Sequence, residues 1–176
     1  RFLRIDATDD FLQTASVDPG TDKVFVCAGV TKMSDATVGI VLESSANSAS
    51  TSGAFRITAP GSNGVTSINF VSGGTTVQNA SRAGFPAPTT VVEVGIGDIA
   101  GDIAEMRLNG AVEATNTGDQ GTGNYTAQPL YIGARAGTSL RLSNGRIYPM
   151  VLCFKAVTAG EIAATEAWVN ARTKGY

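Results

Sequence analysis

Apolar residues in this chain occur in short runs, and turn residues separate the runs. Some runs alternate with polar positions, which is typical of a strand with one buried face, and others are apolar throughout, which is typical of a strand buried on both faces. The pattern predicts strands at residues 2–5, 11–15, 23–30, 38–43, 54–59, 66–71, 75–78, 90–97, 104–108, 111–115, 129–135 and 146–154.

Two Asn-Gly pairs interrupt this pattern. Asn109 and Gly110 separate two alternating runs, and both residue types tolerate positive φ, so we expect a two-residue type I′ hairpin there. Asn144 and Gly145 predict a second turn, which leads into the final strand.

The segment 157–168, "VTAGEIAATEAW", carries the strongest helix start in the chain. Thr158 and Glu161 have the spacing of a capping box, in which each side chain binds the other residue's backbone amide. At about 100° per residue, Ile162, Trp168 and Val169 fall on one face. Residues 148–154 are apolar on both faces, so we expect this helix to lie over the last strand as a structural lid that removes Ile162, Val169 and part of Trp168 from water.

Composition restricts the class of protein. The 176 residues are 43% hydrophobic and 16% charged, with 21 glycines, which suits one all-β domain over residues 1–176. The net charge of −2 argues against a nucleic-acid partner, and no apolar run approaches the ~20 residues of a membrane span. Because the chain begins at Arg1, we expect a processed product or one domain of a longer polypeptide.

Catalytic and metal-binding chemistry finds little support in these residues. The chain has no histidine, which excludes Ser-His-Asp and Cys-His catalysis and histidine-based zinc sites. No two acidic residues stand two positions apart within a predicted strand, although glycoside hydrolases require paired carboxylates. We therefore expect a non-enzyme without a cofactor. Cys27 and Cys153 sit in apolar runs and are either free thiols, which we favour, or a disulfide between two strands.

Four motifs in order resemble those of the concanavalin A-like, or laminin-G-like, jelly rolls. They are "LRIDATDDFLQTAS" (3–16), "RLNG" (107–110), "PLYIGAR" (129–135) and "NGRIYPMVLCFKAVTAGEI" (144–162). The resemblance implies an antiparallel β-sandwich with one short C-terminal helix. The variant with "GTSLRLSNGRIY" (137–148) and "EIAATEAWVNARTKG" (161–175) is most similar to domains of bacteriophage and prophage structural proteins, such as tail fibres and appendages.

The phage resemblance implies a non-enzymatic virion module that serves attachment or assembly. It would be displayed on a fibre, spike or capsid after assembly in the bacterial cytoplasm. Its partners would be other virion proteins, further copies of itself and a host surface glycan. A carbohydrate-binding lectin domain of a secreted cellular protein is the alternative, and a divergent glycan hydrolase is the third interpretation.

One loop, residues 118–125, combines the groups that bind sugars. Asp119, Gln120 and Asn124 offer hydrogen bonds to hydroxyl groups, and Tyr125 offers a ring for stacking on an apolar sugar face. An ordinary polar turn is the competing interpretation. Asp9 and Asp10 suggest a second possibility, calcium, against which we set a role in Asx turns.

Overall fold

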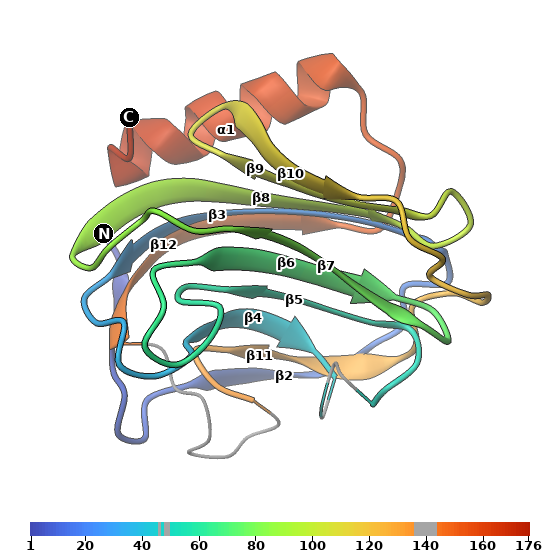
Figure 1. Ribbon diagram of the computed structural model, residues 1–176, viewed down its shortest axis with the longest axis horizontal. Coiled ribbons are helices and arrows are strands. Elements are labelled where there is room, and N and C mark those ends of the chain that lie inside the picture. Colours follow the sequence, from blue (N-terminus) through green and yellow to red (C-terminus); the bar gives the residue numbers. More distant parts are fainter. Residues whose placement is uncertain (46, 48–49, 136–143) are drawn as a thin grey trace.

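Two six-stranded antiparallel sheets pack face to face, and one helix lies on the outer side of the first sheet (Figure 1). The computed structural model describes residues 1–45, 47, 50–135 and 144–176. Parts of the expected loop at 44–52 and of the motif at 137–148 therefore lie outside the described residues.

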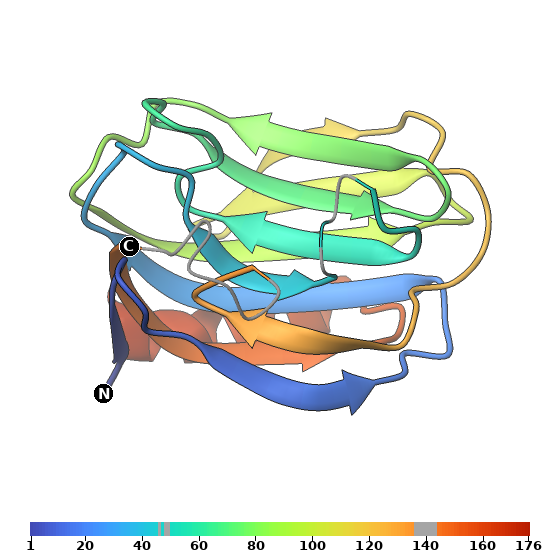
Figure 2. The ribbon, with the colours of Figure 1, turned by 90° about the horizontal axis from the view of Figure 1, so that it is seen from below.

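The strands form two layers, which Figure 2 shows from below. Sheet A has the order β1 (Leu3–Asp6), β12 (Asn144–Cys153), β3 (Lys23–Lys32), β8 (Thr89–Asp98), β9 (Ile103–Leu108) and β10 (Ala111–Asn116). Sheet B has the order β2 (Leu12–Val17), β11 (Gln128–Ile132), β4 (Ile40–Ser44), β5 (Ala54–Thr58), β6 (Ile68–Gly73) and β7 (Val77–Arg82). The predicted fold class is confirmed: a jelly-roll type β-sandwich with one C-terminal helix.

Strand alternation divides the apolar residues of sheet A between two cores. Along β3, Val24 and Val26 face the space between the sheets and join the main core, whereas Phe25 and Cys27 face outward. Sheet A is therefore apolar on both sides over part of its area, as the unbroken apolar run at 23–30 predicts.

The first Asn-Gly pair forms the expected hairpin, and the second does not form a turn. Asn109 and Gly110 have φ values of 53° and 85°, and they connect β9 directly to β10. Asn144 and Gly145 instead begin β12, where Gly145 pairs with Lys32 of β3. A Cβ on Gly145 would clash with the backbone of β3, so this glycine permits a close approach of two strands.

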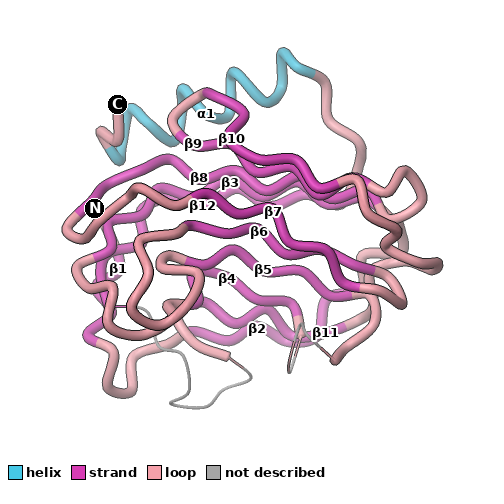
Figure 3. Tube along the Cα trace, in the orientation of Figure 1, coloured by secondary structure: helices cyan, strands magenta, loops and turns pink. Residues whose placement is uncertain are grey.

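Helix α1 (Ala159–Thr173) lies at the C-terminal end of the chain and is drawn in cyan in Figure 3. Its capping box is confirmed, because the Glu161 amide donates to Thr158 Oγ1 at 3.2 Å and the Thr158 amide donates to Glu161 Oε2 at 2.8 Å. The hydrogen bond from the Lys155 ammonium, together with those from the Thr158 amide and hydroxyl, lowers the pKa of Glu161 to about 2. Among the described residues, no helix is long and apolar enough to span a membrane.

Helix α1 covers the outward apolar residues of β3, β8 and β12 together, and not those of the last strand alone. Val169 is fully buried against Phe25 and Val94, and Ile162 is partly buried at the margin. This second core explains why an otherwise all-β chain ends in a helix, since without α1 the outer side of sheet A would expose a large apolar patch.

Trp168 is more exposed than its predicted place on the docked face of the helix implies. Its side chain is 45% exposed and lies against the guanidinium of Arg172, 4.0 Å from the ring centroid. The buried positions of the helix are Glu166, Val169 and Thr173, which recur at the helical spacing. Trp168 is one residue, or about 100°, away from Val169 and therefore falls beside the docked stripe.

Polar and steric contacts fix the docking of α1 at two points. The buried carboxylate of Glu166 accepts a hydrogen bond from Arg107 Nε of β9 at 2.9 Å. Near the helix end, Thr173 occupies the space that a Cβ on Gly29 would fill. Polar and small residues, and not the tryptophan, therefore set the position of the helix.

Both cysteines are free thiols, as we favoured from the sequence. Cys27 is buried beneath α1, and burial raises the pKa of its thiol to about 12. Cys153 is partly buried on the neighbouring strand, and burial raises its pKa as well. Thiols held in the protonated form are weak nucleophiles, so neither residue is poised for thiolate chemistry.

One carboxyl group lies in the main core. Glu93 of β8 is fully buried, and within the described part of the chain neither of its oxygens has a hydrogen-bond partner. Burial raises the pKa of Glu93 well above its usual range, and the nearby Thr58 amide and Lys32 ammonium lower it by less. Burial therefore favours the neutral form of this carboxyl group.

Truncating two neighbouring helix residues should distinguish docking from exposure. We expect Val169→Ala to lower the free energy of unfolding by about 1.6 kcal/mol or more, for two buried carbons at ~0.8 kcal/mol each. Trp168→Ala should cost less than the ~3–5 kcal/mol that is typical when a buried tryptophan is truncated, because Trp168 is 45% exposed. Urea unfolding measures both losses, and a loss of ~3–5 kcal/mol for Trp168→Ala would contradict this packing.

The buried carboxyl should make stability depend on pH. The unfolded chain releases the Glu93 proton near pH ~4.3, whereas the folded chain retains it to higher pH. Stability present below pH ~4.3 is therefore lost as the pH rises, by up to about 1.4 kcal/mol per unit until the folded pKa is reached. Glu93→Gln should flatten this slope in urea unfolding between about pH 5 and pH 8. Parallel slopes for the two proteins would show that Glu93 ionises freely in the fold.

Candidate functional site

Two residues of the predicted sugar-binding loop, Gln120 and Tyr125, are buried. Tyr125 is 1% exposed, and its hydroxyl forms a 2.6 Å hydrogen bond with the Ser72 hydroxyl. Gln120 is completely buried, and its Oε1 accepts a hydrogen bond from Ser72 Oγ at 2.7 Å. A ring and an amide committed to the protein interior cannot contact a sugar, so the predicted roles of Gln120 and Tyr125 are wrong.

The tyrosine is buried because it fills one end of the main core. Its ring meets that of Phe55 edge-on, with centroids 5.6 Å apart, and Gly97 leaves space for its hydroxyl. Burial raises the pKa of the Tyr125 hydroxyl.

The exposed members of this loop do not form a site by themselves. Asp119 Oδ1 accepts a 2.6 Å hydrogen bond from the Gly121 amide, which is the role of an Asx turn. Asn124 is exposed at the adjoining turn. Together with the buried pair, these contacts support the alternative interpretation of residues 118–125 as a structural turn.

The acidic turn near the N-terminus is likewise occupied by backbone contacts. Asp10 Oδ2 accepts from the Asp6 amide at 3.3 Å, and Asp6 Oδ1 accepts from the Thr8 amide at 2.8 Å. Asp9 is exposed beside them. Among the residues that the structure describes, no three His, Cys, Asp or Glu side chains gather where they could hold a metal ion. Calcium binding at Asp9 and Asp10 stays a prediction made from the sequence.

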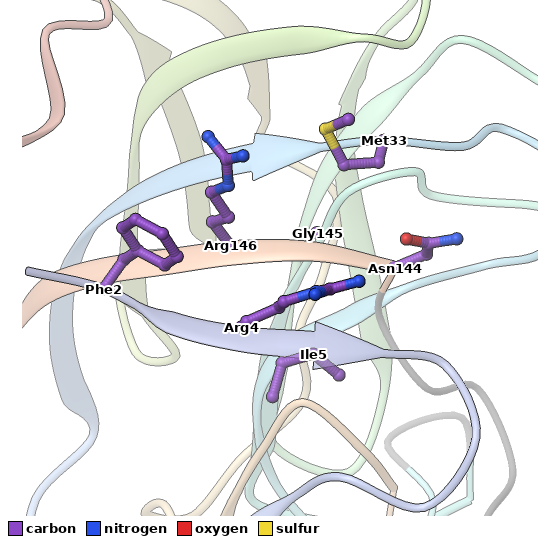
Figure 4. A pocket seen from close by; sticks show the side chains of 7 residues that line it. All are labelled: Phe2, Arg4, Ile5, Met33, Asn144, Gly145 and Arg146. Carbon is purple, nitrogen blue, oxygen red and sulfur yellow. The ribbon is translucent and has the colours of Figure 1, made fainter.

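A different site lies on the outer face of sheet A, where β1 meets β12 (Figure 4). It is an open pocket of about 430 Å³. We call it the arginine pocket, and its lining residues are Phe2, Arg4, Ile5, Met33, Asn144, Gly145 and Arg146.

Strand alternation places the charged side chains of this pocket. Ile5 and Ile147 are buried in the main core, so Arg4 and Arg146, the residues that precede them, point outward. Arg4 and Arg146 are direct partners in the β1–β12 register. In Figure 4 the side chain of Arg4 extends toward Asn144, whereas that of Arg146 rises beside Phe2 toward β3.

The ring of Phe2 lines the pocket and contacts two neighbouring side chains. The Arg146 guanidinium lies 4.9 Å from the ring centroid of Phe2, and the rings of Phe2 and Tyr148 are 5.6 Å apart. Phe2 is 49% exposed. The pocket therefore combines an accessible ring with hydrogen-bond donors.

Helix α1 ends before it reaches the arginine pocket. Thr173, the last residue of α1, packs against Gly29 of β3. Arg146 pairs with Thr31, two residues farther along the same strand, so the pocket lies beyond the helix. The covered part of this face is apolar, and the uncovered part carries the arginines.

Fold and pocket together define a jelly-roll sandwich with a partly basic pocket on one outer face. No protein-family model matches the chain, and no curated protein matches it by sequence. Many solved structures share its fold, although all those described below are at most 12% identical to it.

Three of these structures illustrate the likeness. The CBM40 of the Ruminococcus gnavus IT-sialidase, bound to α2,3-sialyllactose, has TM-score 0.62 and 12% identity, with coverage of 88% of this chain and 97% of that chain. A heptameric SAP-like pentraxin from Limulus polyphemus has TM-score 0.69 and 10% identity, with coverage of 93% and 80%. The botulinum neurotoxin serotype D binding domain has TM-score 0.66 and 9% identity, with coverage of 93% of this chain and 41% of that chain.

At these identities the likeness shows the fold alone. The jelly-roll part of the sequence resemblance is therefore confirmed. The phage part stays a prediction, since the names of these three structures refer to no phage protein.

The buried position of Tyr125 generates a stability prediction. Tyr125→Ala should lower the free energy of unfolding by about 3–5 kcal/mol, as other truncations of large core aromatics do. Tyr125→Phe should cost about 1 kcal/mol, since it leaves Ser72 without one hydroxyl partner. Chemical denaturation checks both values, and an unchanged midpoint for Tyr125→Ala would show that the ring lies at the surface.

Proposed function

We propose that this protein is a non-catalytic glycan-binding module that holds a sugar in the arginine pocket. The observation that carries the proposal is an accessible aromatic ring, Phe2, beside the donors of Arg4 and Arg146 on an uncovered sheet face. Sugars present an apolar ring face together with hydroxyl groups, and this combination of stacking surface and directed donors fits both.

The residues around the ring suit a shallow sugar site. Asn144 offers both a donor and an acceptor, and Met33, which is 47% exposed, adds a second apolar surface. The structural likeness to the sialidase CBM40 and to the toxin binding domain supports a binding role for this fold.

Asp22 and Asp98 both form ion pairs with the Lys23 ammonium, which brings two carboxylates to one place. The hydrogen bond from Lys23 lowers the pKa of Asp22. A glycosidase acid needs a raised pKa, so Asp22 does not suit that role.

The phage setting remains part of the proposal. A fibre, spike or capsid appendage carries several copies of a domain, and presentation of several weak sites raises avidity without a stronger contact. A homo-oligomer that binds host glycans and other virion proteins would use the arginine pocket in this way. A lectin domain of a secreted protein would use the same pocket on another scaffold.

Phe2 provides the test of this function. On a glycan array, the multimerised protein should bind a subset of sugars, and Phe2→Ala should weaken that binding by about tenfold or more, or about 1.4 kcal/mol. Val112→Ala is the matched control, because Val112 is 51% exposed on β10, a strand far from the pocket in the sheet order.

Two outcomes would contradict the proposal. The first is a folded multimer that binds no glycan on the array. The second is equal binding by the Phe2→Ala and Val112→Ala variants, which would place any sugar site elsewhere on the protein.

A further inference from the structure

We propose that the arginine pocket selects acidic glycans by binding a carboxylate or sulfate group of the sugar between Arg4 and Arg146. The inference rests on the proposed function and adds the chemical class of the ligand. It follows from the placement of two like charges side by side, without an ion-pair partner among the described residues.

The two arginines are direct cross-strand neighbours. Arg4 and Arg146 are paired in the antiparallel β1–β12 ladder and lie on the same face. Like charges in this arrangement repel each other and destabilise the pair of strands. A bound anion that contacts both arginine side chains would offset this repulsion.

Neither arginine has an acidic partner within the described residues. The ion pairs of the described chain include neither Arg4 nor Arg146. The sequence at residues 46, 48–49 and 136–143 contains no Asp or Glu, so every acidic residue of the protein belongs to the described part.

The nearest acidic groups along these strands have other partners. Asp6, the next outward position on β1, accepts a hydrogen bond from the Thr8 amide. Asp35 forms an ion pair with the buried Lys32 ammonium and accepts a 2.7 Å hydrogen bond from the Ala87 amide. These contacts give Asp6 and Asp35 partners other than Arg4 and Arg146.

Guanidinium chemistry determines which anions fit. Each group presents several N–H donors in a planar fork, and carboxylates and sulfate oxygens accept two such bonds at once. The stack of Arg146 on Phe2 holds one fork in place before the ligand arrives. Phe2 then contacts the sugar ring while the arginines bind its charged group.

Exposure of both arginines sets the strength of the interaction. Charges at the surface are screened by salt, with a Debye length of about 8 Å at physiological ionic strength. Discrimination between charged and neutral sugars should therefore be largest in dilute buffer and decrease as salt is added.

Matched ligands and variants test the proposal with the full 176-residue chain. The probes are α2,3-sialyllactose, its carboxyl-reduced neutral form, sulfated lactose and lactose. In titrations followed by NMR at low salt, at least one acidic probe should bind about tenfold or more tightly than its neutral counterpart. The counterpart is carboxyl-reduced sialyllactose for sialyllactose and lactose for sulfated lactose. Comparison of the two acidic probes distinguishes carboxylate from sulfate.

The variants separate charge from geometry. Arg4→Ala and Arg146→Ala should each lose the preference for the acidic probe, and the melting temperature of Arg4→Ala should not fall, since that variant removes a repulsion. Arg146→Lys keeps the charge but not the fork, so it should retain only part of the preference. Arg82→Ala on β7 is the control. Arg82 pairs with Glu113 of β10, and β10 is the edge strand of sheet A that lies farthest from β1 in the sheet order.

Three results would overturn the inference, and they separate it from the proposed function. If neutral and acidic probes bind equally and Phe2→Ala weakens both, glycan binding stands and selection by charge fails. If Arg4→Ala and Arg146→Ala keep the full preference for the acidic probe, the charge is recognised elsewhere. If no probe binds and the wider glycan array is also negative, both proposals fail together.

Discussion

The fold depends on one constraint: the central strands of sheet A are apolar on both faces. Their inner residues meet sheet B, and their outer residues, among them Phe25 and Val94, need a second cover. An uncovered apolar face of this size would be unstable in water. Helix α1 provides the cover, and its capping box, its ion pair with Arg107 and its contact with Gly29 all serve to place it there.

The length of that cover determines where a binding site can form. Helix α1 ends against Gly29, so it does not reach the outer face beyond Thr31. This remaining area is formed by β12 and the short edge strand β1, and it carries two arginines with an exposed ring. The same sheet thus presents a buried apolar surface at one part and an accessible polar surface at another.

Polar groups inside the sandwich fall into two kinds. Tyr125, Gln120 and Ser72 form a connected network of hydrogen bonds, which stabilises the end of the core. Glu93 has no such partner among the described residues, and burial favours its neutral form. The first arrangement contributes to stability over a wide pH range, whereas the second reduces stability as the pH rises.

Local rules in the sequence determined most of the fold, and tertiary contacts decided the sites. Strand periodicity, the Asn109-Gly110 hairpin and the capping box depend on neighbouring residues, so the sequence alone predicted them correctly. The exposure of Trp168 and the burial of Tyr125 depend on which face docks and what fills the core. The arginine pocket depends on β1 pairing with β12, which joins opposite ends of the chain. Periodicity indicates which side of a strand faces outward, but not which strand lies beside it, and that pairing places Arg4 against Arg146.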